Sequence, residues 1–321
     1  MGPDPTERQR QGPPAVTPFG ERLAAFVARR ESQVVLGLDP DPQRLWPGAS
    51  DADPGAEATA AARAAAAVGA HCRAVIDAAG PACVAVKPQL ACFERLGAPG
   101  WAALEATARH AEAAGLLVLA DGKRGDIDVS ARAYGQALVG RTPTPFGDVE
   151  GLGADAFTAS PYMGVDTLEV LVGAARENAA GVFVLVRTSN PGARDVEDLP
   201  IAAGGTVWEH VAGIVDRLGA RDGAAAIASV GAVVGATAPE HLARMRELMP
   251  RAPFLLPGVG AQGGRVEDLA PAFAPGRAGG LVTASRSIVD AHARGDAGGG
   301  GPAGAARAEA ERLRAAAWAF T

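Results

Sequence analysis

Eight short apolar runs alternate along the chain with segments whose apolar residues recur at helical spacing. The runs are continuous rather than alternating in polarity, as is typical of strands that are covered on both faces. Strand and helix patterns repeated eight times predict a parallel sheet that closes into a single (β/α)8 barrel, the TIM-barrel fold. The predicted strands span residues 34–38, 83–86, 116–120, 154–158, 181–186, 225–230, 254–256 and 281–283.

The length of 321 residues fits one such barrel with modest additions. Residues 1–16 are rich in proline and glycine without periodicity, so we predict a disordered lead-in there and the barrel domain over 17–321. A doubly wound open sheet is the structural alternative. It is less favoured because no GxGxxG motif follows the first strand, and because charged residues follow several different strands.

Charge and composition argue against several classes of protein. The net charge of −6 and the lack of a basic stripe with aromatic residues give no reason to predict a nucleic-acid partner. No apolar run approaches the ~20 residues of a membrane span, and the polar N-terminus does not resemble a signal peptide, so we expect a cytoplasmic protein. Three cysteines without a metal-type spacing, Cys72, Cys83 and Cys92, are expected to be buried thiols. The five scattered histidines predict no metal site.

Lysine is rare in this chain. Only two lysines, Lys87 and Lys123, occur among the 30 basic residues, and each follows a predicted strand. Arginine keeps its proton at any useful pH, whereas a lysine ammonium is able to transfer its proton. Two lysines could have survived by chance in a chain with arginine-biased codon usage, but chance survivors would be expected on helix surfaces. The two positions therefore favour a chemical role.

The ends of the first three predicted strands carry charges of both signs. Asp39 follows the first strand, Lys87 the second, and Asp121, Lys123 and Asp126 the third. The carboxyl ends of all strands of a parallel barrel open at one mouth, so these side chains should converge, with Asp121 and Lys123 pointing the same way. One interpretation is a set of rim salt bridges, which would add little stability. The other is a site that transfers a proton or stabilises developing charge.

Two loops on the opposite side of the mouth are candidates for binding an anion. The glycine-rich segment 257–264 follows the seventh predicted strand, and the segment 284–287 follows the eighth. These are the positions at which barrels of this kind commonly bind phosphate, with glycines that let backbone N–H groups approach the anion. Arg286 could bind the phosphate through two hydrogen bonds, and Gln262 could donate one from its amide. A phosphorylated substrate is therefore predicted.

These motifs together resemble one known family, orotidine 5′-phosphate decarboxylase, in its longer bacterial branch. The family signature Asp-x-Lys-x-x-Asp-Ile stands here as residues 121–127. The resemblance covers most of residues 18–290, and its motifs in this order and spacing are highly specific. The other matching segments are Gly37-Leu38-Asp39-Pro40, Val86-Lys87-Pro88, Ser189-Asn190-Pro191, residues 257–263 and Ser285-Arg286.

The resemblance implies decarboxylation of orotidine 5′-monophosphate to UMP and carbon dioxide, the last step of de novo pyrimidine synthesis, without a cofactor or metal. It implies that Lys123 protonates C6 of the pyrimidine between Asp121 and Asp126, and that Asp126 reaches the site of the neighbouring subunit in a homodimer. Lys87 and Asp39 would hold the ribose hydroxyls. The remaining implied substrate contacts are Ser130 near the ribose, where the family commonly has threonine, Ser189 at the pyrimidine edge, and Gln262, Arg286, Gly260 and Gly263 at the phosphate. The loop 188–206 is expected to close over the phosphate.

Two other functions remain open at this point. A sugar-phosphate enzyme of the same superfamily shares the Asp-x-Lys-x-x-Asp pattern and stabilises an enediolate with a metal, but the cation Lys87 stands where an acidic metal ligand would be needed. A non-catalytic barrel that senses a nucleotide is the other alternative. Turnover of orotidine 5′-monophosphate in metal-free buffer separates the three.

Overall fold

The computed structural model describes residues 17–52, 54–55, 57–260, 262–294 and 300–320, so the predicted lead-in 1–16 lies outside the described residues. Eight parallel strands close into a barrel in the order β1-β10-β9-β8-β7-β6-β3-β2, which confirms the predicted (β/α)8 fold. The barrel strands are β1 (Val34–Leu38), β2 (Ala85–Pro88), β3 (Leu117–Arg124), β6 (Ala156–Ala159), β7 (Gly181–Arg187), β8 (Val230–Val234), β9 (Phe254–Leu256) and β10 (Gly280–Ala284).

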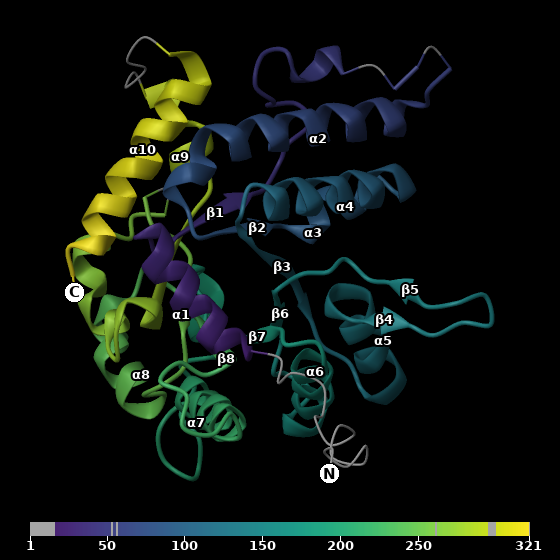
Figure 1. Cartoon of the computed structure of the whole chain (residues 1–321). Coiled ribbons are helices and arrows are strands. Elements are labelled where there is room, and N and C mark those ends of the chain that lie inside the picture. Colours follow the sequence, from purple (N-terminus) through teal and green to yellow (C-terminus); the bar gives the residue numbers. More distant parts are fainter. Residues whose placement is uncertain (1–16, 53, 56, 261, 295–299, 321) are drawn as a thin grey trace, which may run out of the picture.

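Helices surround these strands (Figure 1). Two of the longer ones begin at threonine caps: Thr59 accepts a hydrogen bond from a backbone N–H of the first turn, and Thr206 forms a capping box with Glu209. The α-helices are α1 (Phe19–Arg30), α2 (Ala60–Ala79), α3 (Leu90–Glu94), α4 (Ala98–Ala113), α5 (Asp128–Val139), α6 (Val165–Glu177), α7 (Val207–Ala220), α8 (Leu242–Leu248), α9 (Arg286–Val289) and α10 (Gly301–Trp318).

Alternate residues of each strand divide between two buried clusters. One faces the surrounding helices, and the other combines strand residues such as Ala85, Leu117 and Leu119 with apolar residues of α1. Phe19 of α1 packs so closely on the barrel that a Cβ at Gly181 would lie 2.3 Å from its ring. The helix α1 therefore closes the amino-terminal end of the barrel, and the opposite end is left for a site.

Most strand bounds lie within two residues of the prediction, but two strands differ by more. The sixth strand was expected at 225–230 but forms β8 at Val230–Val234, where three valines favour a strand more than the alanines and single isoleucine of 225–228 do. The third was expected to end at residue 120 and give way to a loop at Gly122. Instead β3 continues to Arg124, with a shift in its pairing to β6 between Ala120 and Arg124. The charged end of this run is thus part of the sheet.

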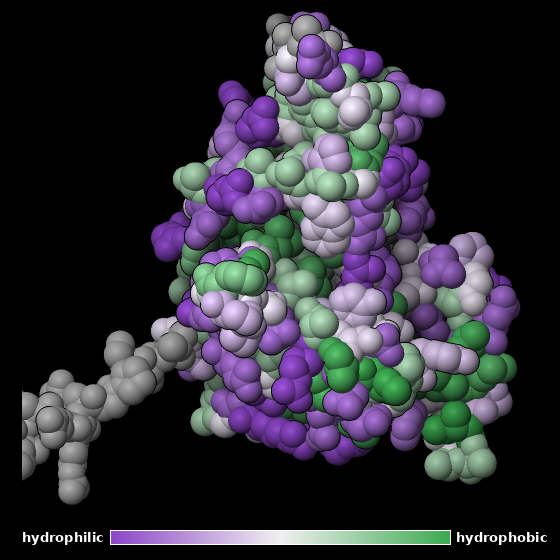
Figure 2. Space-filling model, turned by 90° about the vertical axis from the view of Figure 1, so that its right-hand side faces the viewer, coloured by the Kyte–Doolittle hydropathy of each residue, from purple (hydrophilic) through white to green (hydrophobic). Residues whose placement is uncertain are grey.

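A short antiparallel hairpin follows α5. It pairs β4 (Arg141–Thr142) with β5 (Val149–Glu150), and Phe146 between them is almost fully exposed. Figure 2 looks onto the side on which β4, β5 and α5 lie in Figure 1, and shows hydrophobic side chains gathered in the lower part of this face. Exposed apolar side chains that gather on one face often mark an interaction site.

Candidate active site

Two lysine ammonium groups bind the two oxygens of one carboxylate. Lys87 Nζ lies 2.5 Å from Asp121 Oδ2, and Lys123 Nζ lies 2.7 Å from Asp121 Oδ1. Lys87 and Asp121 are 6% and 5% exposed, whereas the Lys123 side chain is 45% exposed. The adjacent strands β2 and β3 supply all three residues, and the two-residue periodicity of a strand turns Asp121 to the same face as Leu119. We call Lys87, Asp121 and Lys123 the lysine array. Lys123 is its member that is accessible to a bound molecule.

The array is charged at neutral pH. Burial alone would raise the pKa of Asp121, but the ammonium groups of Lys87 and Lys123 and their hydrogen bonds lower it to about 2. Burial alone would lower the pKa of Lys87, but the carboxylate of Asp121, with a smaller contribution from Asp39, raises it. A fixed anion thus holds two cations at the carboxyl ends of β2 and β3.

The depressed pKa of Asp121 predicts a loss of stability in acid. Because the pKa in the folded state lies below the unfolded value, the carboxylate's contribution is present above about pH 4 and is lost as the pH falls towards 2. This contribution is about 2 kcal/mol. We expect the free energy of unfolding in urea to fall less between pH 5 and pH 2 in Asp121→Asn than in the wild type, by about that amount. An equal fall in the free energy of unfolding of the two proteins would contradict the lowered pKa of Asp121.

Two residues that the sequence analysis did not single out also bind Asp121. Thr158 Oγ1, on β6, donates a hydrogen bond to Asp121 Oδ1 over 2.9 Å, and Gln89 Nε2 donates one to Asp121 Oδ2 over 3.3 Å. Both are polar residues at or just beyond the end of an apolar run, which was the available signal. The carboxylate therefore receives one cationic and one neutral donor on each oxygen.

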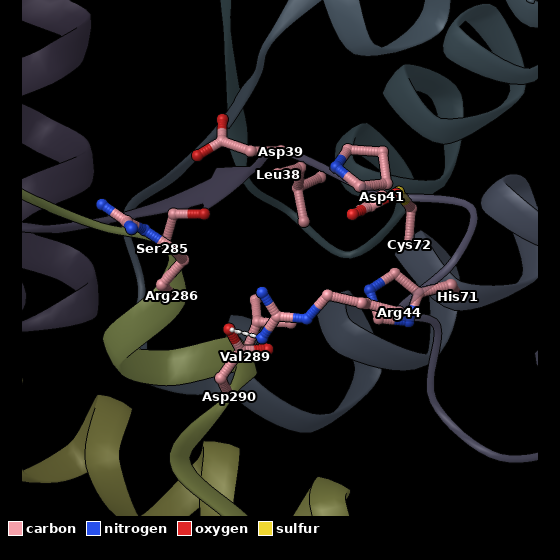
Figure 3. A pocket seen from close by; sticks show the side chains of 11 residues that line it. Leu38, Asp39, Asp41, Arg44, His71, Cys72, Ser285, Arg286, Val289 and Asp290 are labelled. Carbon is pink, nitrogen blue, oxygen red and sulfur yellow. Dashed lines mark hydrogen bonds and ion pairs between the residues drawn. The ribbon is translucent and has the colours of Figure 1, made fainter. Parts of the chain in front are cut away.

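Asp39 and Arg286 line one pocket of about 240 Å³ at the ends of β1 and β10. Figure 3 shows them along one edge of this pocket, with Arg44 reaching to Asp290, to which it is paired at 3.1 Å. The negative charge of Asp39 also contributes to the raised pKa of Lys87, so the pocket adjoins the lysine array. Asp39 and Arg286 are thus brought together, as the sequence predicts for groups at one barrel mouth.

Ser189 and Gln262 line a second cavity of about 630 Å³, which does not include Arg286. The residues Gly260 and Gly263 adopt the left-handed backbone conformation, with φ of 76° and 89°. Their N–H groups donate to Gly264 O and Gly260 O, within the loop itself. A role of these two N–H groups in binding phosphate stays a prediction that requires the loop to rearrange.

The loop after β7 is less irregular than expected. It contains the 3-10 helix η4 (Pro191–Asp195). At its base Arg187 pairs with Asp198 through two hydrogen bonds of 3.1 and 3.0 Å, and Glu197 accepts hydrogen bonds from the backbone and hydroxyl of Thr188. These contacts fix both ends of the segment that carries Ser189. Closure of the loop over a phosphate stays a prediction.

Asp126 and Ser130 lie near the start of α5. The carboxylate of Asp126 accepts a hydrogen bond from the N–H of Ile127 over 2.8 Å, and Ser130 is exposed. Within the described part of one chain, no ion pair joins Asp126 to Lys123. Among the described residues of one chain, Asp126 is thus not within ion-pair distance of Lys123 or Lys87.

Of the three cysteines, Cys72 and Cys83 are buried as predicted, whereas Cys92 is only partly buried. Among the described residues no group of three or more His, Cys, Asp or Glu side chains could hold a metal ion. None of the helices in the part of the chain that the structure describes combines the length and apolar character of a membrane span.

Comparison with known proteins gives concordant matches. The model of the orotidine 5′-phosphate decarboxylase / HUMPS family matches residues 32–298. A curated orotidine 5′-phosphate decarboxylase from Rhodopirellula baltica is 42% identical over 277 residues, which is 86% of this chain and 89% of that protein. One from Deinococcus radiodurans is 46% identical over 242 residues, 75% of this chain and 81% of that protein. The solved structure of Leishmania donovani OMP decarboxylase is 31% identical with a TM-score of 0.67, over 94% of this chain and 99% of that chain.

Proposed function

This chain belongs to the orotidine 5′-phosphate decarboxylase family, and we propose that it converts orotidine 5′-monophosphate to UMP and carbon dioxide by protonating C6 from Lys123. Its curated relatives carry that enzyme's name, and the enzyme is a carboxy-lyase of pyrimidine biosynthesis. The observation that carries the proposal is the buried Asp121 carboxylate between two ammonium groups, of which one is accessible. The proposed compartment is the cytoplasm.

The chemical problem is the charge on C6. When the bond between C6 and the carboxylate breaks, the electron pair stays on C6 in the plane of the ring and cannot delocalise into the π system. A positive charge held close to C6 stabilises this carbanion, and it does so most strongly where water is excluded. The Lys123 ammonium supplies that charge and then transfers one proton to C6, so that UMP forms, carbon dioxide leaves, and the neutral lysine regains a proton from solvent.

The other residues of the array keep Lys123 ready for this step. The charge on Asp121 holds the Lys123 ammonium at 2.7 Å, which fixes its position beside the bound ring. Lys87, buried beside it, adds a second positive charge, so that the two lysines outweigh the single negative charge of Asp121. We propose that these side chains act without a cofactor.

Binding of the substrate is assigned to both sides of the mouth. Asp39 and Lys87 are suited to the ribose hydroxyls because one accepts and the other donates hydrogen bonds. Arg286 is suited to the phosphate, and remote binding energy there would help to align the ring with Lys123. The remaining proposed contacts are Ser130 to the ribose, Ser189 to the pyrimidine edge, and Gln262, Gly260 and Gly263 to the phosphate.

A second copy of the chain is proposed to complete the site. Large apolar side chains that are 42–89% exposed follow β3 and β6, in the segments that flank Asp126 and begin α6. A homodimer that buries this rim would bring Asp126 of one subunit to the Lys123 array of the other. The side chains of this rim are Ile127, Val129, Tyr162, Met163 and Val165.

The direct test is to incubate the purified protein with orotidine 5′-monophosphate in metal-free buffer containing EDTA. The ultraviolet change is followed, and UMP and carbon dioxide are identified as products. We expect turnover that EDTA does not reduce. Binding of the nucleotide without product formation would favour a sensor, and activity that EDTA abolishes would favour the metal-dependent sugar-phosphate enzyme, so either result would overturn the proposal.

Removing Arg286, which we propose binds the phosphate, should weaken substrate binding more than it slows the chemical step. Arg286→Ala is expected to raise KM for orotidine 5′-monophosphate about 10- to 100-fold, because it deletes a charge-assisted hydrogen bond. The matched control is Arg44→Ala. Arg44 lines the same pocket but is paired with Asp290. Steady-state kinetics of both variants measure the effect. Equal changes in KM would argue against a specific role for Arg286.

A further inference from the structure

We propose that Thr158 is a positioning residue that fixes Asp121 and Lys123 in the geometry needed for proton transfer. This inference rests on the proposed function. Thr158 lies on β6, next to β3, and its side chain is 1% exposed. Its hydroxyl donates to Asp121 Oδ1 over 2.9 Å and accepts from the backbone N–H of Lys123 over 2.9 Å. One buried hydroxyl therefore binds the side chain of the anion and the backbone of the proposed proton donor.

The pairing of β3 with β6 explains why a hydroxyl is needed here. Ala120 pairs with Phe157 and Arg124 pairs with Ala159, so three residues of β3 stand opposite Thr158 alone. These three residues are 121–123, the lysine array's own segment. Such a bulge interrupts the regular ladder and leaves backbone groups without their usual partners. The Thr158 hydroxyl takes the place of the missing acceptor for the N–H of Lys123.

The backbone of Lys123 adds a second reason. Its φ is 48°, in the left-handed region that a residue with a side chain rarely adopts because it is strained. The hydrogen bond to Thr158 helps to hold this conformation, which turns the Lys123 ammonium back onto Asp121 two residues earlier. Without this hydrogen bond, the bulge is free to relax, and the Lys123 ammonium is free to move away from C6 of the bound nucleotide.

The test compares Thr158→Val, which keeps the shape and removes the hydroxyl, with Thr158→Ser, which keeps the hydroxyl. The matched control is Thr283→Val on β10. Thr283 is also a buried strand threonine, but its hydroxyl has no hydrogen-bond partner among the described residues. We expect Thr158→Val to lower kcat about 10- to 100-fold, with KM and the Kd of UMP changed less than about threefold. Thr158→Ser should recover kcat to within about threefold of the wild type, and Thr283→Val should leave kcat unchanged within about twofold.

Amide hydrogen exchange at Lys123 separates this inference from the proposed function. The Lys123 amide should exchange faster in Thr158→Val than in Thr158→Ser or the wild type, whether or not the protein decarboxylates the nucleotide. If the wild type shows no turnover, the proposed function fails while the exchange result still reports on the hydrogen bond. The inference is overturned if Thr158→Val retains wild-type kcat, if serine and valine are equally impaired, or if Thr158→Val raises only KM.

Discussion

Lys123→Ala should lower kcat for orotidine 5′-monophosphate by at least about a thousandfold, because it removes the proposed proton donor and with it the positive charge proposed to stabilise the carbanion. The affinity for the nucleotide should change far less than kcat. The Lys87–Asp121 pair remains in the variant, and the proposed phosphate ligand Arg286 lies in a separate pocket. The Kd of UMP, measured by calorimetry, should therefore stay within about tenfold of the wild-type value.

Lys123→Arg is the informative companion to this variant. Arginine keeps the positive charge but does not release its proton at usable pH, so it isolates the loss of proton transfer from the loss of charge. We expect kcat of Lys123→Arg to stay at least about a hundredfold below the wild type. Circular dichroism and thermal unfolding would check that both variants fold. Near-normal turnover in Lys123→Ala would refute the role of Lys123 as proton donor.

The sequence was sufficient to place the lysine array. Lys87 and Asp121 follow apolar runs that read as neighbouring strands, and parallel strands of a barrel must open at one mouth. The spacing of two between Asp121 and Lys123 indicated a shared direction, and the two groups meet at 2.7 Å. The convergence of these groups followed from the fold class, whereas the contact of Lys123 with Asp121 uses the bulge at 121–123 and the left-handed backbone of Lys123 rather than regular strand alternation.

What the sequence could not provide depends on pairing between distant strands. The position of Thr158 opposite residues 121–123 follows from a shift in the register of β3 and β6, and a shift of this kind leaves no local pattern in either strand. The same limit explains the loop at 257–264. Its glycines predicted a loop whose N–H groups approach an anion, but the N–H groups of Gly260 and Gly263 are bound within the loop itself. Which backbone groups are left for a ligand is a property of the folded loop.

A mixture of two inactive variants should recover activity if each site draws on both subunits. Lys123→Ala and Asp126→Ala, co-expressed with different tags and purified on both, would give heterodimers. One site of each heterodimer lacks both residues, and the other contains an intact Lys123 from one chain and an intact Asp126 from its partner. We expect about half of the wild-type activity per dimer, far above either variant alone.

The control mixture is Lys123→Ala with Lys87→Ala. Lys87 and Lys123 bind the same Asp121 within one chain, so each site of this heterodimer lacks one of its two lysines and no activity should return. The contrast between the two mixtures therefore tests which chain supplies Asp126, independently of how strongly each substitution impairs its own chain. Recovery in the control mixture as well would contradict the assignment of Lys87 and Lys123 to the same site of one chain. No recovery in a verified Lys123→Ala and Asp126→Ala heterodimer, or full activity of a monomer, would show that Asp126 acts within its own chain or not at all.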